Sequence, residues 1–113
     1  MAWTLERYER DDGESPVEDF VNALPTKVRA RVRAHLTHLE AVGNRAAAPI
    51  SEAVGEGLFA LRVSVGRHEV RILYAFFLGQ RIVLLHGFLK KTRTIPLREL
   101  ETARARLREL QES

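Results

Sequence analysis

The sequence predicts an α+β fold with the element order β-α-α-β-β-β-α. Three observations indicate it: apolar residues alternate with polar ones over residues 58–90, they recur every three or four positions in two other segments, and turn-forming residues separate these segments. We therefore expect helices packed on a mainly antiparallel sheet. A chain of 113 residues without cysteine predicts one domain, residues 1–113, in a reducing compartment such as the cytoplasm.

The N-terminal segment predicts a strand followed by a short helix. Residues 3–8 alternate in the way of a half-buried strand, and a polar Asp-Asp-Gly cluster follows them. Ser15 fits the N-cap of a helix, because its hydroxyl can accept a hydrogen bond from a free backbone N–H, and Pro16 fits the first helical position. Glu18 completes a capping box, and the helix is expected to end at about Ala23.

A longer helix is expected next. Thr26 should cap its start, and Gly43 should end it. Residues 45–57 contain alanine, glycine and acidic residues without a clear period, and we expect a loop there. The apolar stripe of this helix consists of Val28, Val32, Leu36, Leu39 and Val42.

The second half of the chain predicts three strands and a final helix. Residues 58–65, 69–77 and 81–90 are rich in β-branched and aromatic residues and are joined by two tight turns, which predicts an antiparallel meander. Pro96 is typical of a helix start. The stripe of the final helix consists of Leu97, Leu100, Ala103, Leu107 and Leu110.

The period of the strands places charged residues together on one face of the predicted sheet. Since side chains alternate between faces, Ile72 and Tyr74 should face the helices, and Arg62 and Arg71 should share the opposite, open face. The last strand adds to this open face if its phase is the same. Its contribution would then be Leu84, His86, Phe88 and Lys90.

These residue types suit a ligand that carries phosphate. The planar guanidinium of arginine donates two hydrogen bonds to one phosphate, lysine adds a compact charge, and the ring of Phe88 can stack on an unpaired base. The same residues allow an alternative, in which Arg62 and Arg71 form surface ion pairs with Glu69 or Glu52 while Phe88 packs under the last helix.

The charge distribution allows the same two interpretations. The chain carries a net charge of +3, and its positive charge is concentrated in residues 27–45 and 58–93. Such clustering is typical of a surface that binds phosphates, although a solvated basic face has the same pattern.

His35 and His38 are expected on the surface of the second helix without a third ligand, so no metal site is predicted. The longest apolar run, residues 72–78, is far shorter than the roughly 20 residues that cross a membrane.

Several runs of sequence resemble a known family over essentially the whole chain. They are LFALR at 58–62, VRILY at 70–74 and RIVLLHGFLKKT at 81–92, followed by Ile95, Pro96 and Glu99. They resemble the phage-derived, HigB-like branch of the RelE/ParE toxin superfamily.

The resemblance implies a fold, an activity and a partner. It implies a small RelE-like fold and a bacterial type II toxin that cleaves messenger RNA on translating ribosomes without a cofactor. A cognate antitoxin, encoded by the neighbouring gene, would hold this toxin inactive. Two alternatives stay open: a ParE-like inhibitor of DNA gyrase, and an inactive remnant that still binds its antitoxin.

The resemblance also implies a site. Metal-independent cleavage of RNA needs a proton acceptor for the ribose 2′-hydroxyl, a proton donor for the leaving 5′-oxygen and cations around the phosphate. His86 is one candidate for proton transfer, against the alternative of a structural histidine beneath the last helix, and Lys90 is another. The basic positions that the resemblance implies are Arg62, Arg71, Lys90 and Lys91, and the predicted RNA contacts are Phe88, Arg67 and Arg93.

Overall fold

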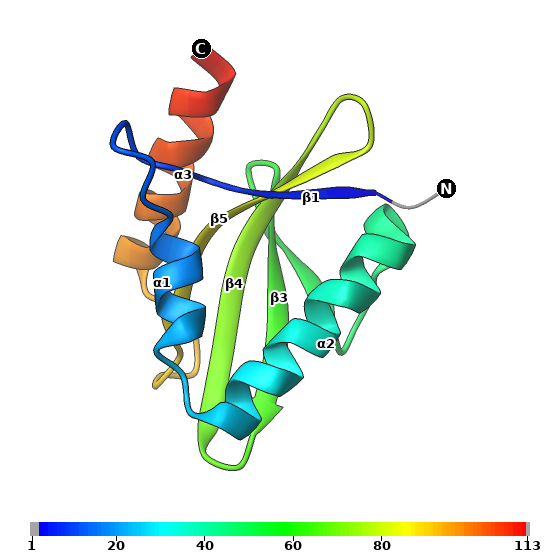
Figure 1. Cartoon of the computed structure of the whole chain (residues 1–113), viewed down its shortest axis with the longest axis vertical. Coiled ribbons are helices and arrows are strands. Elements are labelled where there is room, and N and C mark those ends of the chain that lie inside the picture. The colour runs from blue at the N-terminus through cyan, green and yellow to red at the C-terminus, as the bar shows by residue number, and fades with distance from the viewer. Residues whose placement is uncertain (1–2, 113) are drawn as a thin grey trace.

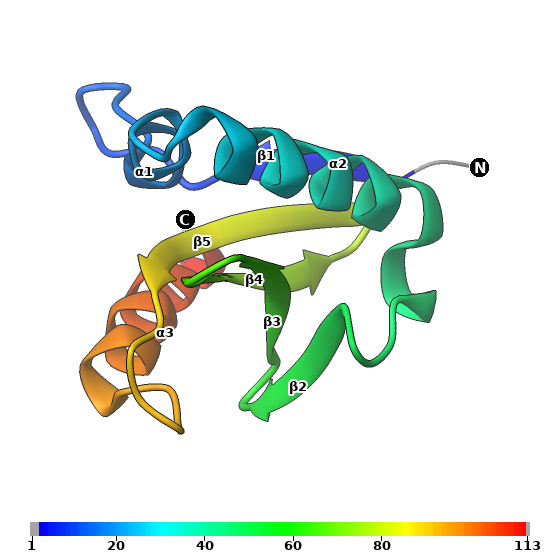
Figure 2. The ribbon, with the colours of Figure 1, turned by 90° about the horizontal axis from the view of Figure 1, so that it is seen from below.

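The computed structural model, which describes residues 3–112, has a mixed α+β architecture with a central sheet (Figure 1). The sheet has five strands in the order β1-β5-β4-β3-β2, and β1 pairs parallel with β5 while the other pairs are antiparallel. Helices α1 and α2 cover one face of the sheet and α3 lies on the other (Figure 2). The strands are β1 (Thr4–Arg7), β2 (Ser51–Gly55), β3 (Leu58–Val65), β4 (His68–Phe77) and β5 (Arg81–Leu89), and the helices are α1 (Pro16–Asn22), α2 (Thr26–Val42) and α3 (Leu97–Glu112).

The predicted fold class and the predicted helices and strands are confirmed. The N-cap at Ser15 is also confirmed, because the hydroxyl of Ser15 accepts a hydrogen bond from the backbone N–H of Glu18 at 3.3 Å. The cap at Thr26 is wrong: α2 begins with Thr26 itself after Pro25, and no side chain caps it.

The loop expected at residues 45–57 is wrong in part, because it contains a strand. Ser51–Gly55 forms β2, which pairs with β3 at the edge of the sheet. Most of its side chains are exposed. An edge strand of this kind buries few side chains and is held by backbone hydrogen bonds, so it leaves no apolar alternation in the sequence.

The face of the sheet under α1 and α2 carries the larger apolar core. Ile72 and Tyr74 of β4 pack there, as predicted, against the stripe of α2. The side chain of Tyr74 is fully buried, and its hydroxyl lies 2.5 Å from the hydroxyl of Ser51 in β2. Trp3 closes one end of this core against Phe76, with ring centroids 5.2 Å apart.

The opposite face of the sheet is not open, which corrects the prediction. Ala103 and Leu107 of α3 pack on Leu73, Ala75 and Leu85 and form a second apolar core. The stripe of α3 was visible in the sequence, but the face that it covers depends on how the chain returns to the sheet after β5. The arginines that were predicted on an open face are instead half-buried, at Arg62, and buried, at Arg71.

A bulge in β5 changes the phase of the last strand. Leu73 pairs with His86 and Tyr74 pairs with Leu84, so Leu85 is an extra residue between them. Leu84 therefore lies in the core under α2, while Phe88 lies in the core under α3. The predicted grouping of Leu84 with His86 and Phe88 is wrong, because a strict period of two does not continue across a bulge.

Candidate functional site

The predicted arginines lie side by side on β3 and β4. Arg62 pairs with Arg71, and Ser64 pairs with Glu69 one step further along the same face. The backbone N–H of Lys90, just after β5, donates to the carbonyl oxygen of Glu69 at 2.7 Å. We call these five residues the arginine site: Arg62, Ser64, Glu69, Arg71 and Lys90.

Arg71 is the most buried charged residue of the arginine site. Its side chain is only 4% exposed. Its Nη1 donates to the carbonyl oxygen of Val70 at 2.9 Å, and Nη1 and Nη2 each lie 3.4 Å from Oε1 of Glu69. Its buried Nε has no hydrogen-bond partner among residues 3–112. A buried guanidinium costs free energy unless its charge is balanced, and Glu69 is the carboxylate that partly balances the charge of Arg71.

Glu69 is the one acidic member of the arginine site, and its side chain is 40% exposed. A hydrogen bond from the hydroxyl of Ser64, 2.8 Å long, together with the charges of Arg71 and Lys90, lowers the pKa of Glu69 below its ordinary value. Glu69 is therefore a carboxylate at neutral pH. This is the ion pair that the alternative interpretation expected for Arg71, but its guanidinium is buried rather than exposed.

Arg62 lies where β3 extends past its edge neighbour. The register of β2 with β3 ends at Leu61, and the backbone N–H of Arg62 donates to the carbonyl oxygen of Ile50 at 2.7 Å, so beyond this point β3 has only β4 beside it. Arg62 is half-buried, and none of the ion pairs among the described residues includes it. It lines a surface pocket together with His35, Pro49, Ile50 and Ser64.

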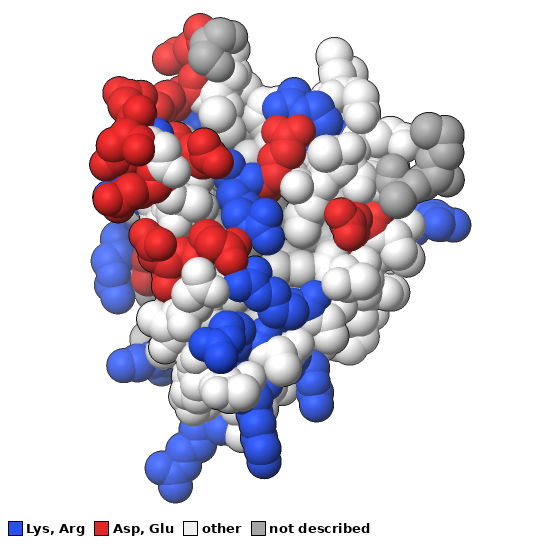
Figure 3. Space-filling view, in the orientation of Figure 1, with Lys and Arg blue, Asp and Glu red and all other residues white. Residues whose placement is uncertain are grey.

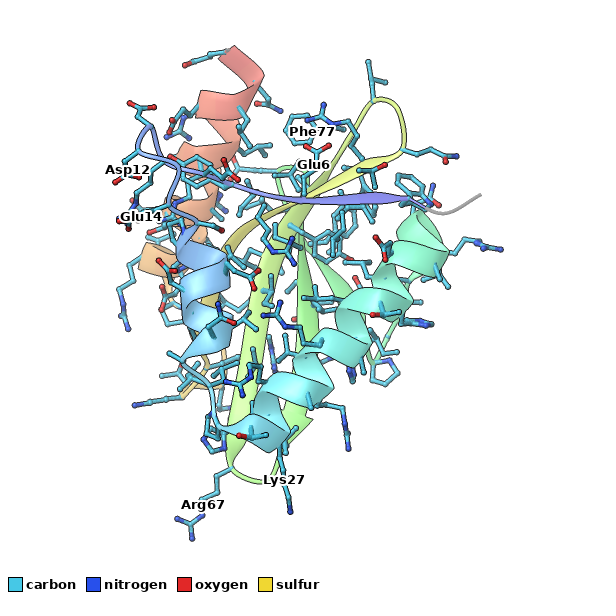
Figure 4. All side chains as sticks on the ribbon, viewed as in Figure 1. Glu6, Asp12, Glu14, Lys27, Arg67 and Phe77 are labelled. Carbon is cyan, nitrogen blue, oxygen red and sulfur yellow. The ribbon has the colours of Figure 1, made fainter. Side chains whose placement is uncertain are left out.

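The other predicted cations lie in the connections at the same end of the molecule. Arg67 is exposed in the turn between β3 and β4, and it projects from the same end as Lys27 of α2 (Figure 4). Lys91 and Arg93 are exposed in the connection from β5 to α3, and Nζ of Lys90 donates to the carbonyl oxygen of Thr92 at 2.6 Å. Lys and Arg side chains gather over the lower half of the molecule, and acidic side chains gather at the upper left (Figure 3).

His86 is engaged through both ring nitrogens. Nε2 lies 2.8 Å from Oε1 of Glu99 on α3, and Nδ1 lies 3.3 Å from Nη1 of Arg106, also on α3. Because a guanidinium only donates, Nδ1 is the acceptor, and Nε2 carries the proton that is donated to Glu99. His86 therefore joins β5 to α3, which is the structural alternative, and in this arrangement neither nitrogen is free to exchange a proton with RNA.

Phe88 is also covered by α3. It is 6% exposed and belongs to the core under that helix. Its ring stacks on the imidazole of His86, with centroids 5.6 Å apart. This is the packing that the alternative interpretation expected, and stacking of Phe88 on a base would require α3 to move.

Comparison with known proteins places the chain in a family. A family model described as phage derived protein Gp49-like matches residues 19–108, which include the whole arginine site. The chain belongs to the Gp49-like family. This family is part of the RelE/ParE-like toxin superfamily, and the five strands and three helices of the structure are consistent with a small RelE-like fold. No curated protein matches the chain.

Three residues of this Gp49-like chain contact the predicted site residues or lie beside them, although the sequence did not indicate that they are functional. Glu69 was visible, because a two-residue turn at Gly66 and Arg67 sets Ser64 opposite Glu69. His35 and Glu99 come from helices, and no local pattern could place them against β3 and β5. Residues 3–112 contain no cluster of three or more metal-ligating side chains and no helix long and apolar enough to span a membrane.

Proposed function

We propose that this chain is the toxin of a type II toxin–antitoxin system of the HigB-like branch, and that it is a ribosome-dependent messenger RNA endoribonuclease. The family supports a toxin. The observation that carries the nuclease is the cluster of three cations that the strand register brings together, in which Arg71 is flanked by Arg62 and by Lys90. This cluster suits a phosphodiester, because negative charge develops on the phosphate in the transition state of cleavage and nearby cations stabilise that charge.

The proposed reaction uses the RNA itself as the nucleophile. The ribose 2′-hydroxyl loses its proton to a base, the 2′-oxygen forms a bond to the adjacent phosphorus, and the bond from phosphorus to the 5′-oxygen breaks. The 5′-oxygen takes the electron pair and a proton from water. The products are a 2′,3′-cyclic phosphate and a 5′-hydroxyl. Arg62, Arg71 and Lys90 would stabilise the charge on the pentacoordinate phosphorus, and no metal enters any step.

We further propose two binding roles for the basic end of the molecule. Arg67, Lys91 and Arg93 would contact the phosphates of messenger RNA on the ribosome, because they are exposed cations beside the arginine site. The cognate antitoxin would cover the same end with acidic side chains in the inactive complex. Binding of the antitoxin should raise the melting temperature of the toxin by mass action, and an unchanged melting temperature would argue against this partner.

Induction in bacteria tests the nuclease directly. Wild type, Arg71→Met and the control Arg108→Met, which makes the same chemical change at an exposed position on α3, would be induced while new messenger RNA 5′-ends are mapped. We expect new ends in translated regions with wild type and with Arg108→Met, and their loss with Arg71→Met. Intact messages together with inhibition of purified gyrase would support the ParE-like alternative. Intact messages with active gyrase would indicate an inactive, antitoxin-binding remnant.

A further inference from the structure

The surface pocket beside Arg62 combines charged, polar and apolar lining residues. It has a volume of ≈ 300 Å³ and is lined by His35, Pro49, Ile50, Arg62 and Ser64. This volume lies at the lower end of the range for small-molecule sites, which is about 300–1,000 Å³. The lining combines a cation, an imidazole and a hydroxyl with the apolar side chains of Pro49 and Ile50. One nucleotide has the matching chemistry, since it joins an anionic phosphate and hydroxyl groups to a flat base.

His35 is held in one tautomer. Its Nδ1 lies 2.9 Å from the carbonyl oxygen of Arg31, one turn earlier in α2. A carbonyl oxygen only accepts, so Nδ1 carries a proton, and the other nitrogen of the neutral ring has a lone pair. Among residues 3–112, Nε2 of His35 has no hydrogen-bond partner. His35 thus has the free ring nitrogen that His86 lacks.

The pocket is continuous with the arginine site through two shared residues. Arg62 lines the pocket and is the register partner of Arg71. Ser64 lines the pocket, and its hydroxyl donates at 2.8 Å to Glu69, which is the counter-ion of Arg71. A phosphate at Arg62 would therefore lie at the border between the pocket and the buried guanidinium of Arg71.

We propose that this pocket holds one ribonucleotide of the RNA strand and that Nε2 of His35 is the base of the cleavage reaction. The inference rests on the proposed function and assigns its missing proton acceptor. Nε2 takes the proton of the 2′-hydroxyl as the 2′-oxygen bonds to phosphorus and the bond to the 5′-oxygen breaks. Water protonates the 5′-oxygen, and the imidazolium of His35 then returns its proton to the solvent. Pro49 and Ile50 provide the apolar surface for the base.

Binding to the pocket can be measured without cleavage. Uridine 3′-phosphate would be titrated into the purified protein while the imidazole resonances of His35 and His38 are followed by NMR. His38 is the matched control, because it is an exposed histidine on the same helix that does not line the pocket. We expect saturable shifts at His35 with no shift at His38. An unmoved His35, or equal shifts at both histidines, would overturn the pocket as a nucleotide site.

The role of the base is tested by cleavage on ribosomes. His35→Gln keeps a polar side chain of similar reach but cannot accept the proton, and His38→Gln is its control. We expect the single-turnover cleavage rate at saturating ribosomes to fall about 100-fold or more in His35→Gln, as is typical on loss of a general base. The apparent affinity for ribosomes and the melting temperature should stay within the range of His38→Gln.

The possible results separate the inference from the proposed function. Added imidazole should restore part of the cleavage rate of His35→Ala, which a purely structural role would not allow. Equal cleavage by His35→Gln and wild type, or a loss of affinity without a loss of rate, would overturn His35 as the base and leave the nuclease intact. If wild type cuts no message, the proposed function and the base role both fail, and the NMR titration still decides whether the pocket binds nucleotides.

Discussion

Replacement of Arg71 by methionine should remove function without removing stability. Arg71→Met keeps the buried stem and removes the guanidinium, including an Nε that is buried without a partner. Relief of that unsatisfied donor is worth about 1–3 kcal/mol. The variant loses the hydrogen bond from Nη1 to Val70 and a long, partly exposed pair with Glu69, which together contribute a similar amount of about 1–3 kcal/mol. The free energy of unfolding should therefore change by no more than about 2 kcal/mol.

Urea denaturation at pH 7 measures this difference, with Arg108→Met as the control. In the same variant the pKa of Glu69 should be higher than in wild type, because the charge of Arg71, which lowers this pKa, is removed. Cleavage should fall by roughly 100- to 1,000-fold, as is typical when one group that stabilises developing charge is lost. A loss of more than about 3 kcal/mol of stability would refute the reasoning. It would mean that the main role of the buried guanidinium is to stabilise the sheet and not to act on a ligand.

Three further predictions concern stability. Gly43→Ala should lower the melting temperature strongly, because the added Cβ would lie 1.9 Å from Nε1 of Trp3 and because Gly43 has φ +56°. Thermal denaturation measures this change, and a small decrease in melting temperature would mean that Trp3 can move away. Ser51→Ala should lower the free energy of unfolding, measured by urea denaturation, by about 1–3 kcal/mol, because it leaves the buried hydroxyl of Tyr74 without a partner. Tyr74→Phe should then cost less stability in the Ser51→Ala background than in wild type. Strictly additive effects of the two substitutions would show that the two hydroxyl groups are not coupled. The pKa of Glu18 is lowered, mainly by its hydrogen bond with Arg33. The contribution of Glu18 to stability is therefore present above the pKa that it has in the unfolded chain, and it is lost as the pH falls through the pKa that it has in the folded protein. Glu18→Gln should reduce the difference in melting temperature between pH 7 and pH 3, and an unchanged difference would contradict this reasoning.

Much of the fold follows from local sequence. The helices and the central strands bury one stripe or one face, and this burial leaves a period of 3.6 or 2 that can be read without the structure. The pairing of Arg62 with Arg71 was also predictable, because the tight turn after Val65 sets the register of β3 and β4. The cap at Ser15 is a contact between neighbours in sequence, and for that reason it was predicted correctly.

The features that the sequence did not reveal depend on contacts between distant segments. β2 is stabilised by backbone pairing with β3, which does not depend on the identity of its exposed side chains. The bulge at Leu85 puts Leu84 on the face opposite to His86 and Phe88, and a single extra residue has no signature in a period-two pattern. The bulge separated Leu84 from Phe88, which the sequence had grouped together.

In the candidate site, too, some features follow from the local sequence and others only from the tertiary structure. The sequence by itself determined which cations share a strand face, because alternation along β3 and β4 is local. Only the tertiary structure decided that α3 buries Phe88 and engages both nitrogens of His86, and that α2 brings His35 to the pocket beside Arg62. The physical reason is that charge and period belong to a segment, whereas burial, tautomer and a free lone pair depend on the neighbours that a residue acquires when segments far apart in the chain pack together.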